Sequence, residues 1–324
     1  MGETMEVLLT GAFGNIGRSC LTRLIQQDHQ VRWFDLRTKT NRRTAKKFKG
    51  QIEVVWGDLR CWNDVAAIVQ DQDVVVHLAF IMPPASENRP EWAWDVNVGG
   101  TQNLLHAMKN PSSPPRIIFV SSFSVFGETQ HKPPPRTVSD PVQPIDNYTH
   151  HKVECERLVR ESGLDWAILR LAVVPPPGLS GFTLKMFDIP PSTRVEFVHP
   201  QDVGLALANA VSCGEVWGKT LLIGGGSGSQ LYYRDFIGRM MESLGVGRLP
   251  EEAFGSVSAY TDWLDTAESQ RLLQYQQHSF GDFVQEMAVS LGYIRYLLRL
   301  FALLIRWWML NKSPYYRLEG RSVL

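Results

Sequence analysis

Tyr148 and Lys152 stand four positions apart in a stretch with the pattern of a helix. Residues at this spacing share one face of a helix. A free phenol has a pKa of about 10, too high for efficient base catalysis at neutral pH, and a nearby ammonium lowers it. The pair predicts proton transfer by Tyr148 with help from Lys152. A solvated helix face is the alternative, because such a pair also arises by chance.

A glycine-rich turn follows a short aliphatic run and opens a helix-forming stretch. Gly11 allows the tight turn, Gly14 lets the backbone approach a pyrophosphate, and Gly17 lets the helix pack closely on the sheet. An acid ends the next apolar run at the position expected to contact ribose hydroxyls. The residues predicted to bind a dinucleotide are Gly11, Gly14, Asn15, Ile16, Gly17 and Asp35. The alternative is an ordinary turn.

Apolar runs typical of strands alternate with helical patterns along the chain. Further strands are predicted at 52–56, 74–78, 117–121 and 166–174, and helices at 63–69, 92–108 and 148–162. This alternation predicts an α/β fold, a Rossmann-type doubly wound parallel sheet with a small C-terminal substrate lobe. We expect a dinucleotide-binding domain at 1–175, to whose sheet the later chain returns, a substrate lobe at 176–287, and a basic, apolar helix and tail at 288–324.

Composition narrows the function classes. The chain of 324 residues has 33 basic and 33 acidic residues, so its net charge does not indicate binding to nucleic acid. Its four cysteines lie far apart, and no cysteine or histidine spacing predicts a metal site. Since Met1–Glu6 is short and polar, we expect no signal peptide and a cytoplasmic location.

Several short motifs occur in a fixed order. They are Thr10-Gly11-x-x-Gly14-x-x-Gly17, Gly57-Asp58-Leu59, His77-Leu78-Ala79, Asn97-Val98-x-Gly100-Thr101, Ser121-Ser122, Tyr148-x-x-x-Lys152, Leu169-Arg170, Phe197-Val198-His199-x-x-Asp202-Val203 and Asp265-Thr266. In order and spacing they resemble the extended short-chain dehydrogenase/reductase family, the NAD-dependent epimerase/dehydratase group. The resemblance covers roughly residues 7–287.

The resemblance implies roles for individual residues. Tyr148 exchanges the proton while hydride moves to or from the nicotinamide, and Lys152 also holds the nicotinamide ribose. Ser122 is the implied hydroxyl donor, with Ser124 as runner-up. Asp58 and Leu59 match the pair that contacts adenine.

Other implied roles are cofactor contact, packing and assembly. Ala79 matches a backbone contact to the cofactor. Asn97 and His199 match structural positions, and we expect His150 and His151 to face solvent. The family also implies a homodimer.

Asp35 favours NAD over NADP, since an acid at this position repels the additional phosphate. Arg37 and the pair Arg42 and Arg43 follow closely and would partly offset that repulsion.

Departures from the family pattern bear on the substrate. Dehydratases carry an Asp-Glu pair where this chain has Phe123 and Ser124. Members that act on nucleotide sugars usually place Asn at position 173 and Arg at 195, where this chain has Val173 and Val195, with Arg194 displaced by one.

The short insertion at 178–198 is apolar. Its apolar residues include Phe182, Leu184, Met186, Phe187 and Ile189. It predicts either packing within a small lobe or a wall for an apolar substrate.

The segment Ile294–Leu310 is almost wholly apolar apart from Arg295, Arg299 and Arg306, which form one stripe on a continuous helix. Three arginines make a transmembrane span improbable. From Ala288 onward the chain has six basic residues and one acidic residue, so this segment has a net charge of +5. We therefore expect an amphipathic helix that contacts the anionic surface on the inner face of a membrane. The alternative is packing against the body or a second subunit.

These observations predict an NAD-dependent oxidoreductase that interconverts a secondary alcohol and a ketone. The expected substrate is apolar: a sterol-like, isoprenoid or acyl compound. A sugar or nucleotide-sugar epimerase with tightly bound NAD is the alternative enzyme. A cofactor-binding regulator without turnover is the alternative from another class.

Overall fold

A computed structural model of the chain describes residues 3–175, 184–257 and 259–316. Predicted features at 176–183, including Phe182, and the end of the basic tail lie outside the described residues. The strands are β1 (Glu6–Thr10), β2 (Gln30–Asp35), β3 (Glu53–Trp56), β4 (Val74–His77), β5 (Arg116–Ser122), β6 (Trp166–Leu171), β7 (Arg194–Glu196), β8 (Lys219–Ile223) and β9 (Gln230–Tyr232). The α-helices are α1 (Asn15–Gln26), α2 (Lys39–Ala45), α3 (Trp62–Ile68), α4 (Ala85–Asn88), α5 (Pro90–Trp94), α6 (Gly100–Ala107), α7 (Asn147–Arg160), α8 (Pro200–Ser212), α9 (Tyr233–Ser243), α10 (Ala267–Leu273), α11 (Phe280–Ser290), α12 (Ile294–Leu300) and α13 (Ala302–Lys312).

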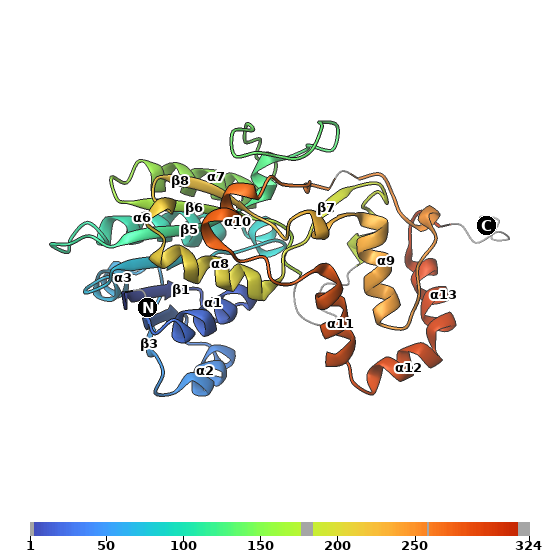
Figure 1. Cartoon of the computed structure of the whole chain (residues 1–324), viewed down its shortest axis with the longest axis horizontal. Coiled ribbons are helices and arrows are strands. Elements are labelled where there is room, and N and C mark those ends of the chain that lie inside the picture. Colours follow the sequence, from blue (N-terminus) through green and yellow to red (C-terminus); the bar gives the residue numbers. More distant parts are fainter. Residues whose placement is uncertain (1–2, 176–183, 258, 317–324) are drawn as a thin grey trace.

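Seven strands form one parallel sheet in the order β3-β2-β1-β4-β5-β6-β8, which confirms the predicted Rossmann-type fold (Figure 1). The strand order reverses between β1 and β4, and ligands of such sheets bind at the carboxyl ends of the strands there. Strand β8 returns to the sheet from the later chain.

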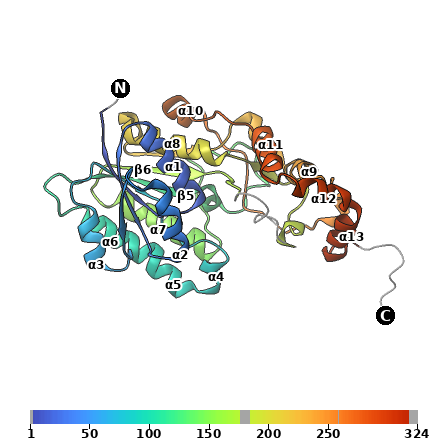
Figure 2. The ribbon, with the colours of Figure 1, turned by 90° about the horizontal axis from the view of Figure 1, so that it is seen from below.

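Helices cover both faces of the sheet. Figure 2 shows α1, α8 and α10 on one side and α3 to α7 on the other. In β1, Val7 and Leu9 pack with the α1–α8 layer, whereas Leu8 packs with the opposite layer. The period of two between successive side chains of a strand produces this division.

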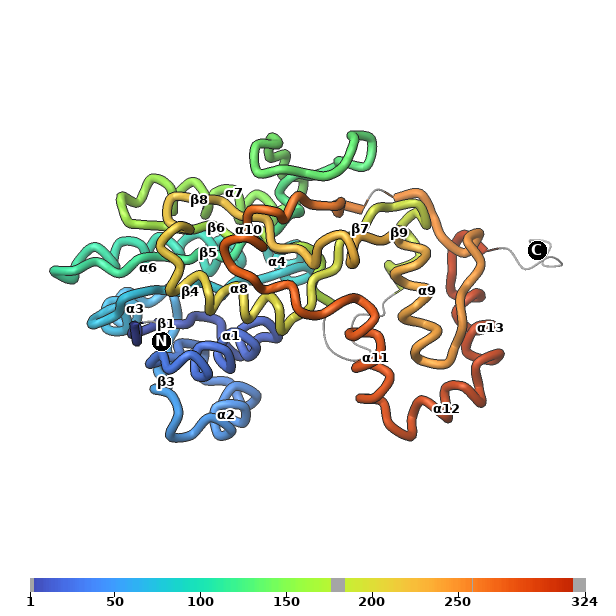
Figure 3. The backbone as a smooth tube through the Cα atoms, viewed as in Figure 1, coloured from blue at the N-terminus to red at the C-terminus, as the bar shows by residue number. Residues whose placement is uncertain are grey.

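A third apolar cluster forms the lobe beyond the sheet. It gathers around the antiparallel pair β7–β9 and helices α9 and α11, and it includes Met186 and Phe187. In Figure 3 the chain runs through α11 and α12 and then returns along α13, around α9. The prediction of one continuous C-terminal helix is wrong, because the segment breaks at Phe301 into α12 and α13.

The predicted helix at 92–108 also differs in detail. Residues Asp95–Gly99 form a π-helical turn between α5 and α6. Asn97 lies in this turn, fully buried, and its side chain bonds both backbone groups of Ile81. It has the structural role that the resemblance implied.

Candidate functional site

A cavity of about 500 Å³ opens where the strand order reverses. Its walls include every predicted cofactor residue except Lys152: Gly11, Gly14, Asn15, Ile16, Gly17, Asp35, Asp58, Leu59 and Ala79. Residues from four separate turns meet there because the carboxyl ends of neighbouring parallel strands share one edge of the sheet. The geometry thus brings together positions that are up to 68 residues apart in sequence.

The three glycines of the turn differ in the space around them. A Cβ at Gly11, where φ is +68°, would lie 2.5 Å from the backbone of Ala79. A Cβ at Gly17 would lie 2.5 Å from Cα of Ala12. At Gly14 the nearest atom would be 3.6 Å away, so packing within the protein does not require glycine there. The open space beside Gly14, at the start of α1, fits the pyrophosphate of a dinucleotide.

Asp35 ends β2 at the rim of this cavity. Its carboxylate accepts hydrogen bonds from the backbone N–H groups of Leu36 (2.7 Å) and Phe13 (3.4 Å) and from the Asn41 side chain (3.2 Å). Burial raises its pKa above the ordinary value, and the backbone bonds act against that shift. These bonds fix the carboxylate beside the glycine turn, where it can accept bonds from ribose hydroxyls.

Asp58 and Leu59 follow β3 and line the same cavity. Arg60 pairs with Asp58 at 2.6 Å and holds the pKa of that carboxyl below its usual range. Leu59 is buried, and a Cβ at Gly100 would lie 2.8 Å from its Cβ, so α6 supports this wall directly.

Ser122, Tyr148 and Lys152 come from the end of β5 and the start of α7. Ser122 caps a short 3₁₀ turn, and its Oγ lies 2.8 Å from Oγ of Ser124. Asp146 caps α7 through the backbone N–H of Thr149 at 2.8 Å, which fixes the turn that carries Tyr148. The structure therefore places both candidate serines beside each other.

The electrostatics of Tyr148 differ from the prediction. Burial raises the pKa of its phenol to about 12, and a hydrogen bond with Ser122 acts in the opposite direction. Burial also lowers the pKa of Lys152 to about 7, and its Nζ donates to the carbonyl of Val120 at 2.6 Å. The lysine therefore does not lower the phenol's pKa in this arrangement, because its amine donates to the Val120 carbonyl and burial disfavours its charged form.

Phe80 is a site residue that the sequence analysis missed. Its ring lies 3.5 Å from Nζ of Lys152 and 5.7 Å, edge-on, from the ring of Tyr148. It also lines the cavity, next to Ala79. Its position after the His-Leu-Ala motif was the available signal.

Glu87 is a second site residue, and no sequence pattern singled it out. Its carboxylate accepts bonds from the backbone N–H groups of Asn147 and Tyr148, each at 3.2 Å. These bonds tie α4 to the start of α7 and help to position Tyr148.

The histidines after Tyr148 behave differently from each other. His150 is exposed, as predicted. The same prediction is wrong for His151, which is buried and accepts a bond from the Asn97 amide at 3.2 Å. The π-helical turn brings Asn97 to this position.

At the positions where nucleotide-sugar enzymes carry residues that contact the diphosphate, this chain has apolar residues, and the nearby arginine is already ion-paired. Val195 is buried, and Val173 pairs with Phe197 through a β-bridge. Arg194 does not compensate, because its guanidinium pairs with the buried Asp262 at 2.6 Å. In the apolar insertion, Met186 and Phe187 are buried inside the lobe, Ile189 packs against the same cluster and Leu184 is exposed. None of these four residues lines the cavity described above.

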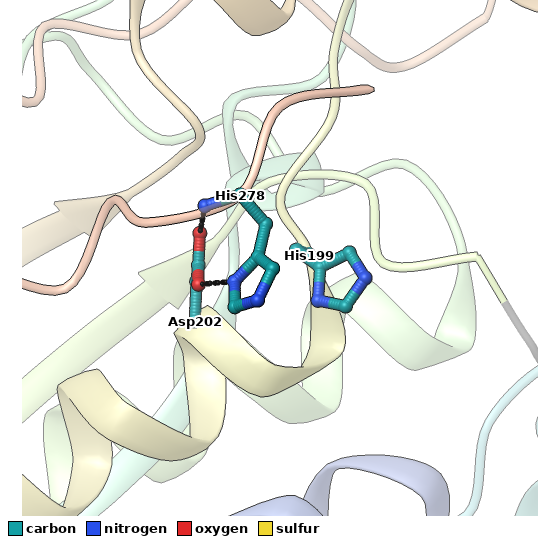
Figure 4. Close-up of side chains that lie close together, drawn as sticks. All are labelled: His199, Asp202 and His278. Atoms are coloured by element: carbon teal, nitrogen blue, oxygen red, sulfur yellow. Dashed lines mark hydrogen bonds and ion pairs between the residues drawn. The ribbon is translucent and has the colours of Figure 1, made fainter. Parts of the chain in front are cut away.

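His199, Asp202 and His278 lie close together outside the cavity (Figure 4). Asp202 accepts from Nδ1 of His278 at 2.5 Å, and His199 stacks on His278 with centroids 4.5 Å apart. His199 uses its Nδ1 to cap α8 through Gln201 and its Nε2 to bond Glu286 at 3.2 Å. A cation would have to replace these bonds, so we assign the group to fastening α11 onto α8.

Comparison with known proteins shows the family of the chain. The family model described as NAD dependent epimerase/dehydratase family matches residues 7–186. The 3 beta-hydroxysteroid dehydrogenase/Delta 5-->4-isomerase of Mycobacterium tuberculosis is 31% identical over 186 residues, 55% of this chain and 48% of that protein. Mouse short-chain dehydrogenase/reductase family 42E member 1 is 31% identical over 232 residues, 62% of this chain and 56% of that protein. The chain spans about half the length of these curated relatives.

Solved structures show the same fold. UDP-glucuronic acid 4-epimerase from Bacillus cereus, in complex with UDP-glucuronic acid and NAD, superposes with a TM-score of 0.74 at 23% identity, covering 90% of this chain and 100% of that one. The dTDP-glucose 4,6-dehydratase DesIV from Streptomyces venezuelae gives a TM-score of 0.74 at 23% identity, covering 90% of this chain and 98% of that one. With the family model matching more than half of its residues, this chain belongs to the NAD dependent epimerase/dehydratase family.

Proposed function

We propose that the chain is an NAD-dependent oxidoreductase that interconverts a secondary alcohol and a ketone on an apolar substrate. The observation that carries the proposal is the convergence of Ser122, Tyr148 and Lys152 beside a cavity walled by the glycine turn and Asp35. A pure cofactor-binding protein would not need the phenol, the hydroxyl and the lysine at these positions.

The glycine turn, the N-terminus of α1 and Asp35 would hold the dinucleotide, with Asp58 and Leu59 at the adenine end. Bound NAD would supply the acceptor for a hydride from the carbinol carbon. The deprotonated form of Tyr148 would accept the hydroxyl proton and return it in the reverse direction, and Ser122 would orient the oxygen. Lys152 would have to break its hydrogen bond to Val120 in order to contact the bound ligands. The ring of Phe80, which lies against the amine, would have to move away.

An apolar substrate follows from what surrounds the site. The same cavity is also lined by the apolar residues Phe80, Ile81, Met82, Trp92, Val96 and Val174. The contacts that a diphosphate requires are absent at Val173 and Val195, and Arg194 is held by Asp262. The curated relatives named as hydroxysteroid dehydrogenases support a sterol-like alcohol.

Cofactor turnover tests the proposal. Purified protein would be mixed with NAD and a panel of sterol, isoprenoid and acyl secondary alcohols, and NADH absorbance followed over time. We expect net NADH with at least one apolar alcohol. Conversion of a nucleotide sugar to its epimer without net NADH would reject the proposed function in favour of an epimerase.

A further inference from the structure

Helices α12 and α13 lie at the end of the molecule remote from the sheet (Figures 1 and 2), and many of their exposed residues are apolar. Leu303 is 83% exposed and Leu300 is 74% exposed. Tyr296, Leu297, Trp307 and Trp308 extend the same surface, each more than half exposed. We call these six residues the outer face. Contiguous exposed apolar surface of this kind marks an interaction site.

The outer face does not belong to the hydrophobic core of the lobe, because the opposite side of the two helices already packs against that core. Leu298, Ile305 and Met309 lie against the apolar cluster of the lobe. After α13, Ser313 donates to the carbonyl of Ala253 at 2.6 Å, and the Tyr315 hydroxyl donates to Asp188 at 3.0 Å. These contacts hold the helices in place and leave the outer face turned away from the protein.

Basic side chains border the outer face. Arg295, Arg299 and Lys312 are exposed, and none of them forms an ion pair with another described residue. The start of the Arg299 side chain lies beside the lobe at Gly245, where an added Cβ would be 3.1 Å from the arginine's Cβ, and Arg299 as a whole is exposed. Long basic side chains at such an edge can reach phosphates while the apolar residues enter the acyl region.

We infer that the outer face of α12 and α13 docks on the surface of an anionic lipid bilayer. An exposed face rich in leucine, tryptophan and tyrosine with a basic border is complementary to such a surface. A second copy fits less well, because an isologous dimer would bring Arg295 and Arg299 of both copies together without an acid between residues 288 and 316. No helix among the described residues has the length and hydropathy to cross a bilayer, so the contact is interfacial. The inference does not depend on the proposed function.

Vesicle flotation of the full chain tests the inference. Vesicles of phosphatidylcholine alone would be compared with vesicles containing phosphatidylglycerol. We expect the protein to float with the anionic vesicles, and the double variant Leu300→Glu/Leu303→Glu to lose about tenfold or more in partitioning. Val138→Glu/Val142→Glu, at exposed apolar positions of a distant loop, is the matched control and should float like wild type.

Two further readouts make the test decisive. Arg295→Ala/Arg299→Ala keeps each Cβ and should reduce flotation only with anionic vesicles, by about tenfold. Melting temperatures of all variants would establish that they fold. If the wild-type protein stays with the unbound fraction, the inference is overturned. If, in addition, sedimentation shows a dimer that Leu300→Glu/Leu303→Glu converts to monomer, the outer face is a subunit interface instead.

Discussion

The glycine turn and the α12–α13 pair are both conspicuous in the sequence, and the structure uses them in opposite ways. The glycine turn faces other parts of the protein and a defined cavity, as the 2.5 Å approaches at Gly11 and Gly17 show. The outer face of α12 and α13 is exposed within the described chain, although the inner side is packed.

This difference shows which structural roles can be inferred from local sequence alone. Glycine positions in a tight turn are dictated by backbone sterics, which a short motif specifies completely. An apolar helix face is consistent with a core, a partner or a lipid surface, and only the packed structure decides which side remains exposed. The cofactor side and the outer face should therefore respond to separate substitutions.

Tyr148→Phe gives the largest expected effect and sharpens this separation. Loss of the phenolic proton carrier should lower kcat by a factor of about 10² to 10⁴. Vesicle flotation should be unchanged. Tyr232→Phe, at an exposed tyrosine, is the matched control and should keep full activity. Turnover that survives in Tyr148→Phe would remove this residue from the mechanism.

The pair Gly14→Ala and Gly17→Ala tests the two uses of glycine within the turn. The Cβ added by Gly17→Ala would overlap Ala12, so we expect the melting temperature of that variant to fall by about 5 °C or more. Gly14→Ala has 3.6 Å of clearance and should melt like wild type, but bind NAD about tenfold more weakly. Calorimetry and NAD titration measure the two effects. Equal NAD affinity in Gly14→Ala and wild type would contradict the assignment of that space to pyrophosphate.

Asp35→Ser should shift cofactor preference by a smaller factor. Removing the carboxylate abolishes repulsion of the additional phosphate of NADP, and Arg37 then attracts it, so the ratio of NADP to NAD affinity should rise about tenfold. Asp165→Ser, at an exposed acid away from the cavity, serves as the control. An unchanged ratio would show that Asp35 does not contact the ribose.

A separate prediction concerns the pH dependence of stability. In the folded protein, burial lowers the pKa of Lys152 from 10.5 to about 7. Between these values the unfolded chain binds more protons, so this lysine makes stability rise with pH from about 7 toward 10.5. Relative to Lys152→Met, wild type should thus gain melting temperature as pH increases through this window. A constant difference between the two proteins would contradict the buried, neutralised amine.

Much of the fold and of the cofactor wall could be predicted from the sequence. The strand alternation and the positions of Gly11, Gly14 and Asp35 follow from local rules, and the structure places them around one cavity. The proximity of Tyr148 to Ser122 required the family motifs, since spacing on α7 alone says nothing about β5.

The remainder depends on contacts between distant segments. Phe80 covers Lys152 because β4 and α7 converge, and Glu87 caps α7 from α4. His278 joins Asp202 across 76 residues of sequence. The break at Phe301 carries no glycine or proline signal, so periodicity alone predicted one helix.

The most direct test of the central claim follows the hydride itself. The chain would be incubated with NAD and an apolar secondary alcohol deuterated at its carbinol carbon, and the reduced cofactor analysed by mass spectrometry. The proposed oxidation predicts that the reduced cofactor carries one deuterium, with an equal amount of ketone, in wild type and not in Tyr148→Phe. Two results together would contradict the account. No apolar alcohol would yield reduced cofactor, and a nucleotide sugar deuterated at the reacting carbon would be epimerised with its deuterium returned to that same carbon.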